Sequence, residues 1–267
     1  MNKRIGAATD DFAVPVKIGL NRVAHLGFGS VELGISSAEL DPRALTRSGR
    51  RHLARYVRDL GLSLSALAAD PAHAKPLGAA NLEARIDHAR AVLEMAAEVG
   101  VPVVTVRLGR LIDPSTHQRT DQAGEVLQVL GEHADRVGAV LAIRAGDDGP
   151  DDLAALFDCL SCPALRVCLD PAALLSVGRE VSRAVESLGK YVALSHTRDA
   201  TLTGSPERLV ETNLGRGEVD LTRYLVALAA AGYAGPHIVR RTDALDPMSD
   251  LAESKAYLEA LLRRVTP

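Results

Sequence analysis

Eight short runs of mostly apolar residues alternate with longer amphipathic segments along the whole chain of 267 residues. The runs that are typical of β-strands are residues 4–9, 30–33, 63–67, 103–107, 139–144, 165–170, 191–196 and 236–240. Strands that are apolar on both faces are typical of a parallel sheet covered by helices. Eight strand–helix units in a chain of this length predict an α/β fold with one domain, a single (β/α)8 barrel over residues 1–267.

A doubly wound open sheet is the alternative fold for the same alternation. Such sheets usually have fewer strands and a glycine-rich turn after the first strand. Here residues 9–15, "TDDFAVP", follow the first run, and they contain no G-x-G-x-x-G motif. The barrel is therefore the favoured prediction.

The segments between the strand-like runs are predicted to be helices. They are residues 16–26, 41–61, 79–99, 120–137, 150–160, 172–188, 220–231 and 246–265. In the second of these helices, Asp41 is expected to be the N-cap, with Pro42 at the first helical position and Gly61 after the last turn. Residues 197–219 form a longer connection, which we expect to be either a lid over the barrel or a simple link to the next helix.

Charge and hydropathy exclude several classes of protein. No apolar run approaches the ~20 residues that span a bilayer, and residues 1–12 lack the apolar stretch of a signal peptide. The net charge is −3 and there is no long basic run, which argues against a dedicated nucleic-acid binder. We therefore expect a cytoplasmic protein with neither a membrane nor a nucleic-acid partner.

The three cysteines do not indicate a disulfide scaffold, because their number is odd and the chain is long. Cys159 and Cys162 form a C-x-x-C pair, but no second pair or suitably spaced histidine lies nearby to complete a zinc site. Redox pairs normally begin a helix, whereas this pair follows the predicted helix 150–160. We expect neither a metal nor a redox role for it.

Charged residues stand at the ends of several predicted strands. In a (β/α)8 barrel the carboxyl ends of the strands surround the active site, and alternate residues of a strand point to the same face. Val140 and Ala142, for example, share the inner face with Arg144. The residues placed at the barrel mouth by this rule are Arg107, Arg144, Asp170, His196 and Arg240, with Glu32 nearby. We expect them to line one ligand cavity, or alternatively to form a structural ion network.

Four motifs occur in an order that resembles a known family. They are "GFGSVELG" at 27–34, "VCLDPAALL" at 167–175, "ALSHTRDA" at 193–200 and "LGRGEVDL" at 214–221. Nearly the whole chain resembles the xylose isomerase-like TIM-barrel family of sugar (phosphate) isomerases and epimerases, whose members are often dimers or tetramers. A homo-oligomer and a small carbohydrate-type ligand are what the resemblance implies. Endonuclease IV is a relative with several zinc ions, but here only His196 among eight histidines lies at an inward strand end.

The resemblance also implies a divalent ion, often manganese, held by Glu, Asp, His and Glu at the ends of the fifth to eighth strands. The matching residues here are Arg144, Asp170, His196 and Arg240. One Asp and one His do not hold a hard divalent ion beside two cations. We therefore expect no metal cofactor. The two family glutamates also act as acid and base, a role that arginine cannot take at neutral pH.

The sequence favours an isomerase- or epimerase-like protein that acts on a small, anionic sugar or sugar derivative. His196 is the expected acid or base, and Asp170 is expected to orient it or to act as a base itself. The candidates for substrate binding are Arg107, Arg144, Arg240, Glu32 and Asp199, the last of which would touch a hydroxyl or fix a loop.

The alternative is a non-catalytic relative, a ligand binder or a partner subunit with a degenerate metal site. In that case the arginines would pair with Glu32 and Asp170 and fill the former metal site. An open pocket over Arg144 and Arg240 distinguishes the two hypotheses.

Overall fold

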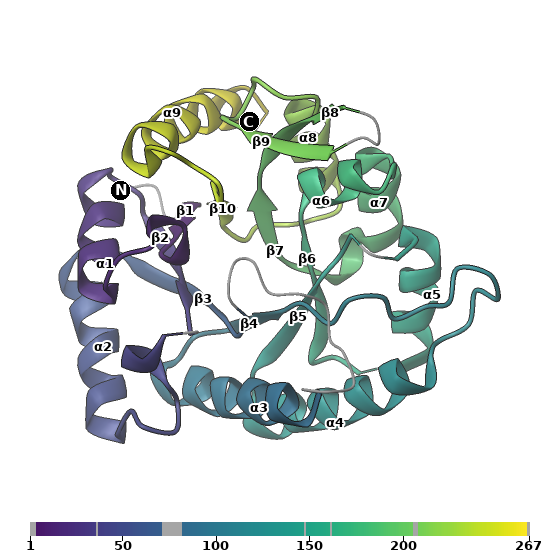
Figure 1. The fold of residues 1–267 in the computed structure, drawn as a ribbon, viewed down its shortest axis with the longest axis horizontal. Helices are drawn as coiled ribbons and strands as arrows, with labels where there is room; N and C mark the ends of the chain where they lie inside the picture. Colours follow the sequence, from purple (N-terminus) through teal and green to yellow (C-terminus); the bar gives the residue numbers. More distant parts are fainter. Residues whose placement is uncertain are drawn as a thin grey trace.

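The computed structural model describes residues 4–35, 37–70, 82–146, 148–160, 162–204 and 208–265. Parallel strands close into a barrel in the order β1-β10-β7-β6-β5-β4-β3-β2, which confirms the predicted (β/α)8 fold (Figure 1). The barrel strands are β1 (Ile5–Ala8), β2 (Ser30–Gly34), β3 (Ser63–Ala68), β4 (Val103–Val106), β5 (Val140–Arg144), β6 (Leu165–Leu169), β7 (Val192–Thr197) and β10 (His237–Val239).

Helices surround the barrel, as Figure 1 shows. They are α1 (Val16–His25), α2 (Arg47–Asp59), α3 (Leu82–Val99), α4 (Asp121–Val137), α5 (Pro150–Leu160), α6 (Pro171–Ser176), α7 (Val181–Leu188), α8 (Leu221–Ala230) and α9 (Pro247–Val265). The described residues also contain short 3-10 helices: η1 (Asp10–Phe12), η2 (Ala38–Leu40) and η4 (Gly189–Tyr191). No helix in the described ranges is long and apolar enough to cross a membrane.

Two apolar layers hold the barrel together. The larger layer fills the space between the strands and the helices, and includes Leu67, Leu141 and Tyr224. The smaller layer lies inside the barrel and consists of Ala8, Ala66, Val103, Ala142, Cys168, Leu194 and Ile238. Because Ala142, Cys168 and Leu194 are inside, the predicted alternation on β5, β6 and β7 is correct, and the residues two positions further on reach the barrel mouth.

The predicted start of the second helix is wrong. Asp41 accepts a hydrogen bond from the backbone N–H of Arg43 (3.0 Å), and this local bond turns the chain before a helix can begin. The helix α2 begins at Arg47, where the Thr46 hydroxyl accepts from the N–H of Gly49 (3.2 Å). Thr46 rather than Asp41 is therefore the N-cap.

Two further expectations need correction. The helix predicted for 172–188 is divided into α6 and α7, because Gly178 between them has a φ of +66° that ends a helix. The connection 197–219 contains an antiparallel pair of strands, β8 (Asp199–Thr203) and β9 (Arg208–Thr212). The first residues of the predicted helix 79–99 lie outside the described residues, and α3 is described from Leu82.

The close approach of β1 to its neighbours requires a glycine. A Cβ at Gly6 would lie 2.6 Å from Ile238 Cδ1 and 2.9 Å from the Ser30 carbonyl oxygen. We predict that Gly6→Ala lowers the free energy of unfolding by about 1–3 kcal/mol, because the neighbouring strands must move apart. Urea unfolding measures the change.

The matched control is Gly19→Ala in α1, where the added Cβ would lie 3.5 Å from the Thr9 carbonyl oxygen, an ordinary contact. Alanine is favoured over glycine inside a helix by about 0.5–1 kcal/mol, so this variant should be slightly stabilised. Equal effects of the two substitutions would contradict the proposed crowding at Gly6.

Candidate functional site

A cavity of about 180 Å³ opens at the carboxyl ends of the strands, above the apolar interior of the barrel. All five residues that the sequence placed at the mouth line it: Arg107, Arg144, Asp170, His196 and Arg240. Arg198, Leu209 and Thr242 also line the cavity. An open pocket therefore remains over Arg144 and Arg240.

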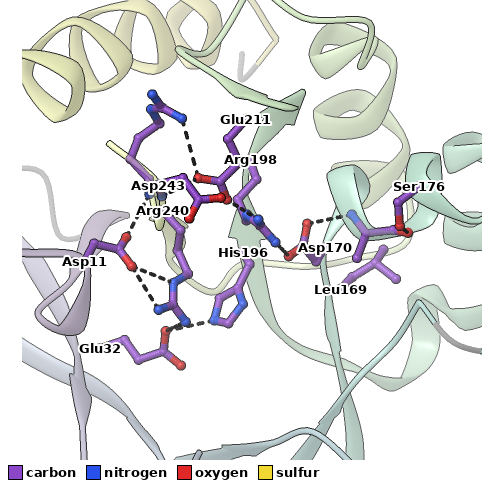
Figure 2. A network of polar contacts seen from close by, with 12 residues as sticks. Asp11, Glu32, Leu169, Asp170, Ser176, His196, Arg198, Glu211, Arg240 and Asp243 are labelled. Carbon is purple, nitrogen blue, oxygen red and sulfur yellow. Dashed lines mark hydrogen bonds and ion pairs between the residues drawn. The ribbon is translucent and has the colours of Figure 1, made fainter. Parts of the chain in front are cut away.

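Glu32, in the middle of β2, is fully buried and does not line this cavity. Its Oε1 accepts a hydrogen bond from the hydroxyl of Thr105 (2.7 Å). Its Oε2 lies 2.8 Å from His196 Nε2 and accepts from Arg240 Nη1 at 3.5 Å (Figure 2). Glu32 lies behind the cavity wall, where its contacts hold His196 and Arg240, which do line the cavity.

The protonation of the Glu32–His196 pair follows from its surroundings. Burial disfavours the charge on Glu32, but His196, Arg240 and Arg144 outweigh it and hold the pKa of the carboxyl well below its ordinary value. Burial lowers the pKa of His196; Glu32 opposes this shift, and Arg240 and Arg144 add to it. The pair at neutral pH is a carboxylate beside a neutral imidazole, whose Nε2–H donates to Glu32.

Arg240 is the most heavily paired cation of the site. It is 3% exposed, and its guanidinium lies 2.8 Å from Asp10, 3.0 Å from Asp11 and 3.5 Å from Glu32. Burial opposes its charge, but the three carboxylates raise the pKa of Arg240 well above its ordinary value. Arg240 therefore stays charged and fixed in position.

Asp170 is held by two donors at the end of β6. Arg198 Nη1 donates to Oδ2 (2.8 Å), and the N–H of Ala173 donates to Oδ1 (3.1 Å), so that Asp170 also caps α6. Burial is outweighed by Arg198 and His196, which lower the pKa of Asp170 and keep it ionised. Among the described residues the hydrogen-bond partner of His196 is Glu32 and not Asp170, so the expected orienting role belongs to Glu32.

Arg198 joins the hairpin β8–β9 to the cavity. It pairs with Asp170 on one side and with Glu211, on β9, on the other (Figure 2). Glu211 also pairs with Arg241 (3.4 Å). The same hairpin contributes Leu209 to the cavity wall. The hairpin β8–β9 and Arg198 therefore contribute to the site, in addition to connecting β7 to α8.

Arg144 has a different environment from Arg240. Its Nε and Nη2 atoms are buried and have no hydrogen-bond partner among the described residues. Its side chain lines the cavity beside His196 and Asp170. These two N–H groups have lost their hydrogen bonds to water without a replacement in the described residues, which is unfavourable in free energy.

Asp199 does not line the cavity, which corrects its expected contact with substrate. Its buried carboxylate accepts from the backbone N–H groups of Gly215 (2.9 Å), Gly217 (3.0 Å) and Val219 (3.1 Å). A Cβ at Gly217 would overlap this carboxylate. Of the two roles expected for Asp199, fixing the loop is the one that the contacts support.

Several residues of the site were not predicted from the sequence: Asp10, Asp11, Thr105, Arg198, Arg241 and Glu211. A signal existed for two groups of them. Asp10 and Asp11 follow β1 directly, and Arg198 has the same parity as His196 two residues later. Nothing in the sequence indicated Glu211, because β9 was not recognised as a strand.

None of the three cysteines lines the cavity. Cys159 is exposed in the last turn of α5, Cys162 is half-buried, and Cys168 lies inside the barrel; all three are free thiols. Burial raises the pKa of the Cys168 thiol well above its ordinary value, so it stays protonated. Within the described ranges no three His, Cys, Asp or Glu side chains are grouped so that they could hold a metal ion.

The chain is a (β/α)8 barrel protein with a charged cavity at the carboxyl ends of its strands. Barrel enzymes have their active sites at this end. The chain belongs to the xylose isomerase-like TIM barrel family, whose sequence profile matches residues 20–261. A comparison with curated protein sequences gives no match.

Solved structures share the fold at low sequence identity. A xylose isomerase domain protein from Planctomyces limnophilus superposes with a TM-score of 0.82 at 20% identity, over 98% of this chain and 97% of that one. A xylose isomerase-like TIM barrel protein from Mycobacterium smegmatis, in complex with magnesium, gives 0.78 at 19%, over 100% and 98%. A D-tagatose 3-epimerase-like protein gives 0.78 at 16%, over 98% of each chain. The fold is that of sugar isomerases and epimerases.

The burial of Asp11 predicts that the stability of the protein depends on pH. Burial and the neighbouring Asp10 raise the pKa of Asp11 from 3.8 to about 6, although Arg240 opposes the shift. The folded chain therefore binds a proton that the unfolded chain releases between these two values, and stability falls as the pH rises through them. Relative to Asp11→Asn, the wild type should lose roughly 2 kcal/mol of unfolding free energy between pH 4 and 6.

Urea unfolding at several pH values tests this prediction. The Gly19→Ala variant is the control, because no titratable group changes and its difference from the wild type should not depend on pH. A difference between the wild type and Asp11→Asn that stays constant over this range would contradict the raised pKa.

Proposed function

We propose that the protein isomerises a small anionic sugar derivative in the cavity at the barrel mouth, with His196 as the base and without a divalent ion. The observation that carries the proposal is that Nε and Nη2 of Arg144 have no hydrogen-bond partner among the described residues, and that Arg144 lines the same cavity as a neutral histidine. Relatives in fold include structures titled L-ribulose 3-epimerase and D-psicose 3-epimerase, which supports a sugar-like substrate.

An anionic ligand is favoured by the distribution of charge. Arg240 and Arg198 already have carboxylate partners, whereas Arg144 Nε and Nη2 have none among the described residues. A carboxylate or phosphate beside Arg144 would provide the missing charge-assisted hydrogen bonds after a small rotation of its side chain. The volume of about 180 Å³ restricts the ligand to a small molecule.

The residues present do not fit the divalent ion of the family. Two of the four ligand positions are Arg144 and Arg240, and their charge repels a cation. The other two are engaged: Asp170 by Arg198, and His196 by Glu32. We therefore derive no step through a metal.

The chemistry can be assigned to protein groups alone. The neutral imidazole of His196 donates through Nε2 to Glu32, which leaves Nδ1 to accept a proton from the carbon next to a carbonyl. The C–H electron pair then forms the C=C bond of an enediolate, and the negative charge moves to the former carbonyl oxygen. Arg144 stabilises that oxygen, and Glu32 stabilises the imidazolium.

The proton then returns from His196 to the neighbouring carbon, and a hydroxyl proton moves between the two oxygens, so that the ketose and aldose forms interconvert. One base on one face of the substrate is sufficient for this isomerisation. Inversion at a single carbon requires a second proton donor on the opposite face. Asp170, ionised and bound by Arg198, is poorly suited to donate a proton, and this favours isomerisation over epimerisation.

A ligand-binding protein without catalysis is the second candidate. It is favoured by the ion network around Arg240, where three carboxylates surround one cation in the manner of a structural cluster. In that case Arg144 would still bind an anion, but His196 would only support the barrel.

Exchange with solvent deuterium distinguishes the two candidates. We predict that a panel of small sugar acids and sugar phosphates in D2O contains a compound whose C–H signal disappears from the proton spectrum when the protein is added. His196→Gln, which keeps an N–H for Glu32, should slow exchange at least ~100-fold with little change in binding. Arg144→Gln should weaken binding about 10-fold or more.

Arg183→Gln is the control for charge, because Arg183 is an exposed arginine that pairs with Asp151 on the outer surface. Binding that depends on Arg144 without any exchange would favour the non-catalytic candidate. Binding of no anion, or equal losses in both arginine variants, would overturn the anionic site.

Metal content is a separate prediction. After incubation with manganese and zinc and then desalting, we expect less than about 0.1 ion per chain by elemental analysis, because the ligand set is incomplete. Arg144→Glu, which returns a carboxylate beside Asp170 and His196, should retain more manganese than the wild type. About one ion per chain in the wild-type protein would overturn the metal-independent mechanism.

A further inference from the structure

We propose that a second site, a groove between α2 and the end of α3, binds an extended acidic segment of a partner protein. The groove has a volume of about 950 Å³. Gly61–Leu64 and Gly100–Val101 lie at its inner end, just before and at the start of β3 and before β4. It therefore reaches the amino-terminal end of the barrel, opposite the cavity, and the inference does not depend on the proposed function.

The outer wall of the groove is basic. Arg51, Arg55 and Arg58 line it from α2, and all three are exposed. None of them forms an ion pair with another residue in the described ranges, whereas Arg50 on the same helix pairs with Glu98 (2.9 Å). Glu98 is the acidic residue of the lining, and its charge is already matched by Arg50. The groove therefore carries an uncompensated positive charge.

The spacing of these arginines does not stabilise the helix α2. Arg47, Arg51 and Arg55 are separated by four residues, and Arg58 follows Arg55 by three. Like charges at these intervals repel one another on one helix face and reduce helix stability. An anionic partner would remove this repulsion. The row of arginines is therefore explained better by a role in binding than by a role in helix stability.

The floor of the groove is apolar, in contrast to its wall. Its accessible apolar surface comes from the half-buried Ala54, Leu64 and Val99, whereas Val57, Leu62 and Val101 are almost completely buried and offer little surface. A surface with apolar floor and basic wall matches a ligand that presents apolar groups on one side and carboxylates on the other. An inorganic polyphosphate would leave the apolar floor unused.

An extended peptide fits the dimensions. Arg51 and Arg55 are about 6 Å apart along the helix axis, and alternate residues of an extended chain are roughly 6.6 Å apart on one side. Acidic residues at every second position would therefore face successive arginines, and the residues between them would face the floor. The lining contains no Trp, Tyr or Phe, so bases of a nucleic acid would find no stacking partner.

The test is fluorescence anisotropy of a labelled eight-residue peptide of alternating glutamate and leucine, titrated with the full chain at low salt. The wild type should bind it, and the triple variant R51Q/R55Q/R58Q should bind about 10-fold more weakly or worse, because three charge pairs are lost. The matched control is R136Q/R263Q/R264Q, which removes three exposed arginines outside the groove and should change affinity less than about 3-fold.

Three results would overturn the proposal. The first is equal weakening in both triple variants, which would mean attraction by net charge alone. The second is tighter binding of oligothymidine or tripolyphosphate than of the peptide with the same dependence on Arg51, Arg55 and Arg58. The third is no peptide binding by the wild type. Circular dichroism of both triple variants ensures that a loss of affinity is assigned to the side chains of a folded protein.

Discussion

The carboxylate of Glu32 is the interaction on which the upper end of the barrel depends. A buried carboxylate is tolerated only with partners, and Glu32 takes its partners from three other strands or strand ends: Thr105 in β4, His196 in β7 and Arg240 after β10. Arg240 in turn binds Asp10 and Asp11, which follow β1. One ionic layer therefore joins five strands above the apolar interior and fixes both the ring of His196 and the direction of Arg240.

Arg144 and Arg240, which both line the cavity, have different surroundings. Arg240 forms ion pairs with three carboxylates and helps to hold the ends of the barrel strands together. Arg144 has no such partner among the described residues and lines the cavity. The two cations at the mouth of the barrel therefore differ: Arg240 is neutralised within the fold, whereas Nε and Nη2 of Arg144 have no hydrogen-bond partner among the described residues.

The sequence determined the barrel and its inner face because both follow from local periodicity. The positions of Arg144, Asp170 and His196 around one cavity follow from strand parity alone. The partners of these residues were harder to predict, since Asp10 and Asp11 meet Arg240 only when β1 closes the barrel against β10. The start of α2 was missed because the local bond of Asp41 competes with capping, and β9 because its short polar strand has no clear alternation.

The contacts of Asp199 have a consequence for variation of the site. This single carboxylate binds three N–H groups between Gly215 and Val219, so the point where the hairpin leaves β7 and the point where the chain returns toward α8 are tied together. Both ends of the segment are therefore fixed by the same carboxylate, next to β7 and before α8. A barrel built in this way can exchange the wall above its cavity, and with it the shape of the ligand admitted, while its frame stays the same.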